Sequence, residues 1–192
     1  MRTFGIPVVC DFTIDSIPVV AYNFVEFKTP YCFRYFRYIS PENSFANVAE
    51  IEFFDEKGEN LRGTIIGTDG YFEDSGNDKY KVFDGNTLTY FHAPLNTGAW
   101  MGMDMLKKTC IKRIAFLPRN DDNFIREGEI YELFYWNLNR WISLGKQTGS
   151  SKEKQKLLYQ NVPSNALLLL RNLSKGKEER IFTWKNGKQV WW

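Results

Sequence analysis

Side chains able to carry out catalysis are few in this sequence of 192 residues. His92 is the only histidine, so most Ser/His or Cys/His catalytic arrangements would have to include it. No Gly-x-Ser-x-Gly elbow, HExxH motif, phosphate-binding loop or dinucleotide fingerprint occurs. Adjacent carboxylates occur at Asp121-Asp122 and Glu178-Glu179. Neighbouring residues of a strand point to opposite faces, whereas a glycosidase needs two carboxyl groups that face each other. We interpret both pairs as surface charges and expect a protein that is not an enzyme.

Residues suited to binding a polar ligand lie between or beside the predicted strands. They are His92, Arg119, Asn120, Asp121 and Asn123. Planar Arg, Asn and Asp groups can bond two vicinal sugar hydroxyls at once, and the loops of a β-sandwich carry its function. A surface ion pair of Arg119 with Asp121 or Asp122 explains the same residues equally well. An exposed loop aromatic, Phe124, Tyr71 or Phe72, is a further candidate for stacking on a sugar face.

Short strands separated by turn signals predict the scaffold that must hold these loops. Residues 47–55 alternate, with Ala49, Ile51 and Phe53 on one side, and Asn186-Gly187 predicts a type I′ hairpin turn. Further strands are predicted at 61–66, 88–92, 99–105, 111–117, 129–136, 140–144, 166–172, 180–184 and 189–192. Residues 151–158 fit either a turn or two of helix or a solvated loop. No βαβ alternation occurs, so the pattern predicts an all-β sandwich or jelly roll.

The first 30 residues differ from the rest of the chain. Pro7, Pro18 and Pro30 are spaced too closely for a helix, with short apolar stretches between them. We interpret residues 1–30 as an extended lead-in that contributes one or two edge strands at most.

Charge and hydropathy exclude two kinds of partner. The net charge is +2 with the basic residues dispersed, which argues against nucleic acid. The longest apolar run, Ala166 to Leu170, is far too short for membrane insertion. Aromatic residues make up 17% of the chain, an excess that favours strands and stacking surfaces. Met1 to Pro7 has no apolar signal core, so we expect either a cytosolic protein or a piece of a longer secreted chain.

The cysteines are three, Cys10, Cys32 and Cys110, and none forms a CxxC motif. An odd count argues against a disulfide framework and against a zinc site. We favour three unpaired packing thiols. One disulfide among them is the alternative in an oxidising compartment.

Residues Tyr80 to Gln147 resemble the coagulation factor 5/8 type C, or discoidin, domain, a group that includes the family 32 carbohydrate-binding modules. Three pieces carry the resemblance in order: VFDGNTLTYFH (82–92), GAWMGMDM (98–105), and IKRI (111–114) followed by PRND (118–121), YELFYW (131–136) and Trp141. Each piece is short, but together their order and spacing are fairly specific. The resemblance implies a galactose-binding-like jelly roll that binds carbohydrate.

Two segments depart from that pattern. Phe33 to Phe54 resembles the C-terminal part of the same family, yet here it precedes the Asp-Gly segment, which suggests a permuted or extended fold or the end of a preceding module. Gly5 to Thr13 weakly resembles a strand of bacterial transglutaminase-like enzymes, without their Cys nucleophile before it or their His after it. That second resemblance implies the non-catalytic C-terminal part of a larger enzyme, with Cys10 a strand residue.

The discoidin resemblance also implies a structural calcium ion. Asp84, Asn86 and Thr89 match the family's calcium loop, and Glu50 matches its remaining ligand, with Glu179 a competing candidate. Calcium takes six or more oxygen ligands, which a tight glycine-containing turn can supply. Asn86 stands where the family often has Asp, which removes one charge. The alternative is an Asp-Gly turn capped by its own side chain, without metal.

The same resemblance places the tryptophans and the binding loops. The positions of Trp100, Trp136 and Trp141 are buried in the family, so we expect core residues there. The His92 and Arg119 segments lie at one end of the sandwich in those modules.

Taken together, the sequence predicts a non-catalytic carbohydrate-binding module. We expect an all-β, galactose-binding-like jelly-roll β-sandwich over residues 31–192, accessory to a secreted enzyme that acts on glycans or glycoproteins. The ligand is a galactose-type or N-acetylhexosamine-type glycan, the protein a monomer, and the location extracellular or periplasmic. A protein-interaction or structural sandwich that binds no sugar is the alternative, and enzyme activity is expected only in a longer parent chain.

Overall fold

The computed structural model describes residues 12–70, 76–176 and 178–192, with the side chains of 178–180 outside the description. The chain divides into two compact units, Met1–Asn123 and Phe124–Trp192. The described residues are almost entirely strands, loops and turns, with one short 3-10 helix, η2 (Lys79–Val82). The all-β prediction is therefore confirmed, and the strands form two antiparallel sheets, one in each unit.

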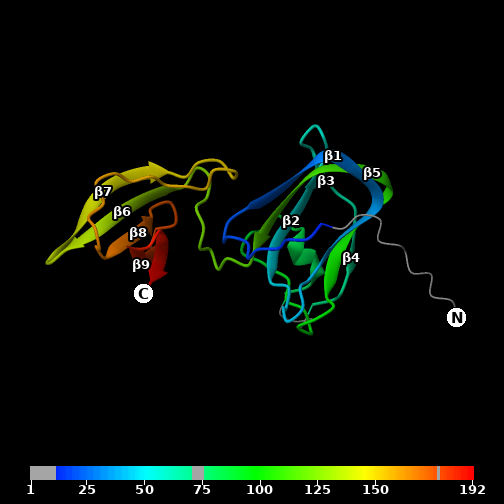
Figure 1. The fold of residues 1–192 in the computed structure, drawn as a ribbon, viewed down its shortest axis with the longest axis horizontal. Helices are drawn as coiled ribbons and strands as arrows, with labels where there is room; N and C mark the ends of the chain where they lie inside the picture. Colours follow the sequence, from blue (N-terminus) through cyan, green and yellow to red (C-terminus); the bar gives the residue numbers. More distant parts are fainter. Residues whose placement is uncertain (1–11, 71–75, 177) are drawn as a thin grey trace. The chain divides into compact units, whose positions relative to one another are not determined.

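The sheet of the first unit is built on two long strands, β1 (Asn23–Ile39) and β5 (Trp100–Pro118), which pair along their lengths. The other edge of β5 pairs with β4 (Thr64–Gly67) near its start and with β2 (Val48–Phe54) near its end. The short β3 (Asn60–Leu61) pairs with β2. Two register shifts interrupt the β1–β5 pairing, and Leu106 has a φ of 62°. These irregularities accompany the strong curvature of both strands in Figure 1.

The core of the first unit lies on one side of this curved sheet. The alternation seen in the sequence places Ile51 and Phe53 in it, 4% and 3% exposed. Phe91, Met101 and Met103 complete its centre. These side chains remove a continuous apolar surface from water, which is the main favourable term in folding.

Strand β1 passes very close to β5 at Gly102. A Cβ atom at Gly102 would lie 2.1 Å from the carbonyl oxygen of Phe36. No side chain fits at that distance, so this position near the start of β5 requires glycine.

A disulfide joins β1 to β5. Cys32 and Cys110 lie directly opposite each other in the register, and their sulfur atoms are bonded across 78 residues of sequence. The expectation of three unpaired thiols is therefore wrong for this pair, because opposite positions on neighbouring antiparallel strands bring two side chains together. Cys10 lies outside the described residues.

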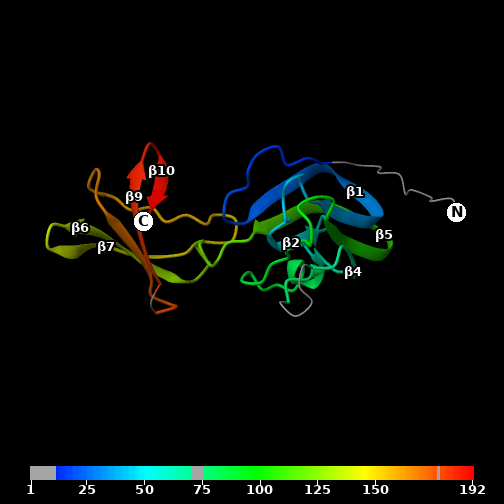
Figure 2. The same cartoon turned by 90° about the horizontal axis from the view of Figure 1, so that it is seen from below.

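The second unit is a five-stranded antiparallel sheet with the order β10-β9-β8-β6-β7. Its strands are β6 (Ile130–Asn137), β7 (Arg140–Thr148), β8 (Leu168–Asn172), β9 (Glu178–Lys185) and β10 (Lys188–Trp191). Asn186 and Gly187 both have positive φ, 51° and 74°, as the predicted type I′ turn requires. Figure 2 shows the resulting β9–β10 hairpin. Leu133, Leu168 and Phe182 form a small core on one face.

Several predicted strand boundaries differ from the structure. The strands predicted at 99–105 and 111–117 are one continuous strand, and the strand predicted at 61–66 is split between β3 and β4. Residues 88–92 form no strand beyond a single bridge between Phe91 and Val48. Residues 151–158 are loop and turn. Strand β1 extends across the expected boundary near residue 30, and no helix in the described part of the chain is long and apolar enough to cross a membrane.

Candidate functional site

Asn47 joins the two segments that the sequence singles out for ligand binding. Its backbone carbonyl accepts a hydrogen bond from the Arg119 N–H at 3.0 Å, and its side-chain Oδ1 lies 2.9 Å from Nδ1 of His92. The next residue, Val48, pairs with both Phe91 and Pro118. His92 and Arg119 are therefore held at the same end of β2, although 26 other residues separate them in the sequence.

His92 is packed against an exposed aromatic ring. Its imidazole stacks on Phe45, with ring centroids 5.0 Å apart and an angle of 9° between the planes. Phe45 itself is 42% exposed. The backbone N–H of His92 donates to the carbonyl of Asn77, so two hydrogen bonds and one stacking contact fix the residue. Because the two rings are stacked, each covers part of one face of the other, and Phe45 keeps exposed atoms.

Arg119 packs against another aromatic ring of the same cluster, that of Tyr90. Its guanidinium carbon lies 4.3 Å from the ring centroid of Tyr90, and its Nε donates to Asp121 Oδ1 at 2.9 Å. The Asp121 hydrogen bond is the main reason that the pKa of Arg119 is raised. The side chains of Arg119 and Asp121 are 40% and 63% exposed. The ion pair considered from the sequence is thus formed, and both partners still contact solvent.

Asn120 does not face the surface with its neighbours. It is 4% exposed, its amide nitrogen donates to the carbonyls of Thr87 and Pro118, and its Oδ1 accepts from the Asp122 N–H. The candidate ligand role for Asn120 is therefore replaced by a structural one: it ties this loop to the Asp-Gly segment. Asn123 is exposed, and its backbone N–H donates to the carbonyl of Asn120.

Three residues of this cluster were missed by the sequence analysis. They are Phe45, Asn47 and Tyr90. Tyr90 fell within a predicted strand, and Phe45 and Asn47 lie in the segment Phe33 to Phe54, where nothing marked them as binding residues. Of the loop aromatics considered, Phe124 contacts Arg126 at 4.6 Å, while Tyr71 and Phe72 lie outside the described residues. An unusual local density of aromatic residues around His92 was the only available signal.

The predicted calcium loop is held together by its own hydrogen bonds. Asp84 Oδ1 accepts from the Asn86 N–H at 2.8 Å, and the Thr89 hydroxyl contacts both Asp84 oxygens at 3.1 and 3.0 Å. Asn86 Oδ1 accepts from the Leu88 N–H, and Lys81 Nζ lies 3.5 Å from Asp84 Oδ2. These are the bonds of a capped Asp-Gly turn, the alternative considered above.

Glu50 adds a feature that such a turn alone does not explain. It is 1% exposed, and neither side-chain oxygen makes a hydrogen bond of good geometry, although the Asp84 carboxyl group and the backbone of Gly85 lie close to it. Burial, with a contribution from the neighbouring Asp84, raises the pKa of Glu50 to about 8. A buried carboxylate without donors is costly unless it is protonated or bound to a cation.

These residues fit a hard cation. Glu50 and Asp84 supply two carboxylates, and Asn86 and Thr89 add neutral oxygens in the same loop, the donor type that calcium prefers. No group of three or more His, Cys, Asp or Glu side chains that could hold a metal ion occurs within the described ranges, so a cation here would have only two carboxylates, those of Glu50 and Asp84. The side chain of Glu179 lies outside the described residues.

Two tryptophans expected in the core lie elsewhere. Trp136 is 40% exposed, and Trp141 packs edge-on against it with ring centroids 5.3 Å apart. Both belong to the hairpin of β6 and β7, where the opposite face carries the core residue Leu133. Trp100 is half-buried in the first unit, under the guanidinium of Arg37.

Comparison with known proteins does not assign a family: no family model, no curated protein and no solved structure matches this chain. The discoidin-like resemblance therefore stays a prediction from the quoted motifs.

Proposed function

We propose that the first unit is a non-catalytic carbohydrate-binding module whose binding surface is the cluster around His92 and Arg119. The observation that carries the proposal is the convergence of both segments on Asn47. It gathers an exposed aromatic ring, an imidazole, a guanidinium and a carboxylate on loops beside one end of the sheet. Such a set of groups suits a sugar, because a sugar offers one apolar face for stacking and pairs of hydroxyl groups that both donate and accept hydrogen bonds.

The charges of the cluster support a neutral ligand. Arg119 and Asp121 offset each other, and each keeps solvent-exposed atoms for a hydroxyl pair. A galactose-type or N-acetylhexosamine-type glycan fits this chemistry. We also propose a jelly-roll form for the fold; the curved antiparallel sheet of the first unit supports it, whereas the last motif piece, Tyr131 to Trp136 with Trp141, belongs to the second unit.

A bound calcium ion would brace the Asp-Gly loop. The unpartnered Glu50 carboxylate beside Asp84 supports this role. When bound, the ion would supply the positive charge that Glu50 lacks. Glu50, Asp84, Asn86 and Thr89 would hold it, and Asn120 would connect the braced loop to the Arg119 loop through Thr87.

An extracellular or periplasmic location is part of the proposal. The Cys32–Cys110 disulfide supports it, because such bonds persist in oxidising compartments and are rare in the cytosol.

Titration with galactose-type and N-acetylhexosamine-type sugars by calorimetry or NMR tests the proposal. We expect a dissociation constant on the order of 0.1–1 mM. Arg119→Ala should weaken binding by roughly 10-fold to 100-fold, since a hydrogen bond to a charged group contributes about 1.5–3 kcal/mol. Arg37→Ala is the matched control, because Arg37 also lies over an aromatic ring, that of Trp100, elsewhere in the first unit.

Two results would count against the proposal. If sugars bind equally well to Arg119→Ala and His92→Ala, the site lies elsewhere. If no sugar binds at millimolar concentration, the Arg119–Asp121 pair is only a surface ion pair, and a protein-interaction or structural domain becomes the better assignment.

A further inference from the structure

The second unit carries more aromatic surface than its core uses. Five of the six tryptophans of the chain lie in it. Trp136, Trp184, Trp191 and Trp192 are 40%, 54%, 49% and 76% exposed, while the core consists of smaller residues. The strand pairing places Trp136 on the same face as Phe134 and places Trp184 on the opposite face, so exposed aromatic surface occurs on both faces of the sheet.

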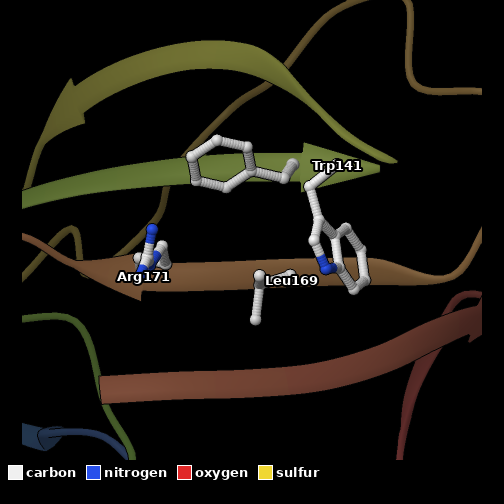
Figure 3. Close-up of a pocket in the computed structure, with 4 residues that line it drawn as sticks. Trp141, Leu169 and Arg171 are labelled. Atoms are coloured by element: carbon white, nitrogen blue, oxygen red, sulfur yellow. The ribbon is translucent and has the colours of Figure 1, made fainter. Parts of the chain in front are cut away.

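A pocket of about 210 Å³ opens on the face of the sheet opposite the core. Phe134 of β6, Trp141 of β7, and Leu169 and Arg171 of β8 line it (Figure 3). Phe134 and Leu169 are paired across the two strands, so their side chains share one face. Leu169 is 5% exposed and forms the floor, and Figure 3 shows the indole of Trp141 reaching over it from one side.

Arg171 is the polar residue that lines this pocket, and Glu132 lies beside it on the neighbouring strand. The Arg171 guanidinium carbon lies 5.9 Å from the Phe134 ring centroid. Glu132 is opposite Arg171 in the β6–β8 register, and its Oε1 accepts a hydrogen bond from the Ser143 hydroxyl at 2.7 Å. A planar donor group, the guanidinium of Arg171, and a planar acceptor group, the carboxylate of Glu132, are therefore neighbours on adjacent strands, close to the ring of Phe134.

We propose that this pocket is a carbohydrate-binding site that takes one hexopyranose ring of a neutral glycan. The apolar face of the ring lies against Trp141 and Phe134. Its hydroxyl groups accept from Arg171 and donate to Glu132. The exposed Trp136, in edge contact with Trp141, extends the aromatic surface to the next sugar of the chain.

Size and charge together select this ligand class. The pocket is smaller than the roughly 300–1,000 Å³ typical of drug-sized ligands, so it holds a single ring. Glu132 beside Arg171 offsets the positive charge, which removes the advantage that a nucleotide phosphate or an acidic peptide would gain. A neutral polyol needs both a donor and an acceptor beside its apolar face, and the pocket provides both. The site lies in a different unit from the His92–Arg119 cluster, and its test is independent of that proposal.

The experiment is an NMR titration of the intact chain, labelled with ¹⁵N at the tryptophan indoles, with N-acetyllactosamine. We expect the indole signals of Trp141 and Trp136 to shift with a dissociation constant on the order of 0.1–1 mM. The signal of Trp184 should not shift, because the pairing places Trp184 on the opposite face of the sheet from Leu169. This measurement uses the wild-type protein, so a variant that fails to fold cannot obscure it.

Variants then assign the site. Trp141→Ala and Arg171→Gln should each weaken binding at the second unit at least 10-fold. Trp184→Ala, at a more exposed tryptophan on the other face, should change it less than twofold, and Arg119→Ala should leave the Trp141 shift intact. If the Trp141 signal is unmoved at millimolar sugar, the proposal is overturned. It is also overturned if adenosine monophosphate or an acidic peptide shifts Trp141 at lower concentration than the sugar. A loss of the Trp141 shift in Arg119→Ala would place the sugar in the first unit instead.

Discussion

Glu50→Gln in metal-free protein should remove the pH dependence of stability that the buried carboxyl group imposes on the first unit. Glu50 is buried without a hydrogen-bond partner, and its pKa is raised from 4.5 to about 8. Between these two values the folded state holds a proton that the unfolded state has released. Stability is then highest near and below the unfolded pKa and falls as the pH rises toward 8.

The raised pKa sets the size of this effect. Each pH unit between the unfolded and folded pKa costs about 1.4 kcal/mol, so wild-type stability should fall by roughly 3–4 kcal/mol from pH 5 to pH 8. Glutamine is neutral at every pH and has almost the same shape. Glu50→Gln should therefore remove this decline and stabilise the metal-free protein by about 3 kcal/mol at pH 7.

Urea denaturation of metal-stripped protein, followed by circular dichroism at pH 5 and pH 8, measures both quantities. Amide hydrogen exchange in β2 assigns the change to the first unit. Glu56→Gln is the control, because Glu56 is an exposed glutamate shortly after the same strand. If wild-type stability is unchanged between the two pH values, or if Glu50→Gln declines as steeply, the account of Glu50 as a buried uncompensated carboxyl group is refuted.

Calcium should narrow the difference in stability between the wild type and Glu50→Gln. Saturating calcium at about 100 times its dissociation constant would stabilise the wild type by about 2.7 kcal/mol at pH 8. Glu50→Gln, with one fewer carboxylate, should gain much less. An equal gain in both proteins would leave the self-capped Asp-Gly turn as the explanation of the loop.

Three further predictions concern stability alone. Replacing Cys32 and Cys110 by alanine should cost about 2–4 kcal/mol, because their bond closes 78 residues, and chemical denaturation with and without reductant measures this cost; an unchanged midpoint would argue against the bond. Gly102→Ala should lower stability by roughly 1–3 kcal/mol or prevent folding, since its Cβ would lie 2.1 Å from a carbonyl of β1; a wild-type melting temperature would contradict this. Asn172→Ala should cost about 1–3 kcal/mol because the Asn172 amide donates to Glu129 at 2.6 Å in a half-buried network, and amide exchange in β6 should quicken; unchanged protection of β6 would show that Asn172 contributes little.

Local patterns predicted the all-β class and several strands. Alternation located β2, and Asn186-Gly187 located the last hairpin, because both signals come from residues adjacent in sequence. Residues 88–92 have a strand-like composition, yet their N–H groups do not all bond to one neighbouring strand. Those of Thr89, Phe91 and His92 donate to the carbonyls of Asn86, Val48 and Asn77, respectively. Composition alone does not reveal where a backbone group finds its partner.

The remaining discrepancies depend on pairings between distant residues. The sequence does not show that Cys32 lies opposite Cys110, since that depends on the register of two long strands. Trp136 was expected in the core because the resembling family buries that position, and alternation could not correct this, since both faces of β6 carry aromatic residues. In the candidate site, His92 and Arg119 were identified by type, whereas Asn47, which positions both, had no distinguishing pattern.

The dependence of β1 on β5 has a consequence for how the chain folds during synthesis. Every partner of β1 in the sheet comes from β5, which leaves the ribosome long after β1 does. The aromatic residues of β1 must therefore wait unpaired, and sheet formation requires closure of a long loop, which slows folding. A waiting strand of this kind is prone to pair with another chain, which gives a physical reason for early chaperone contact or for folding only after export.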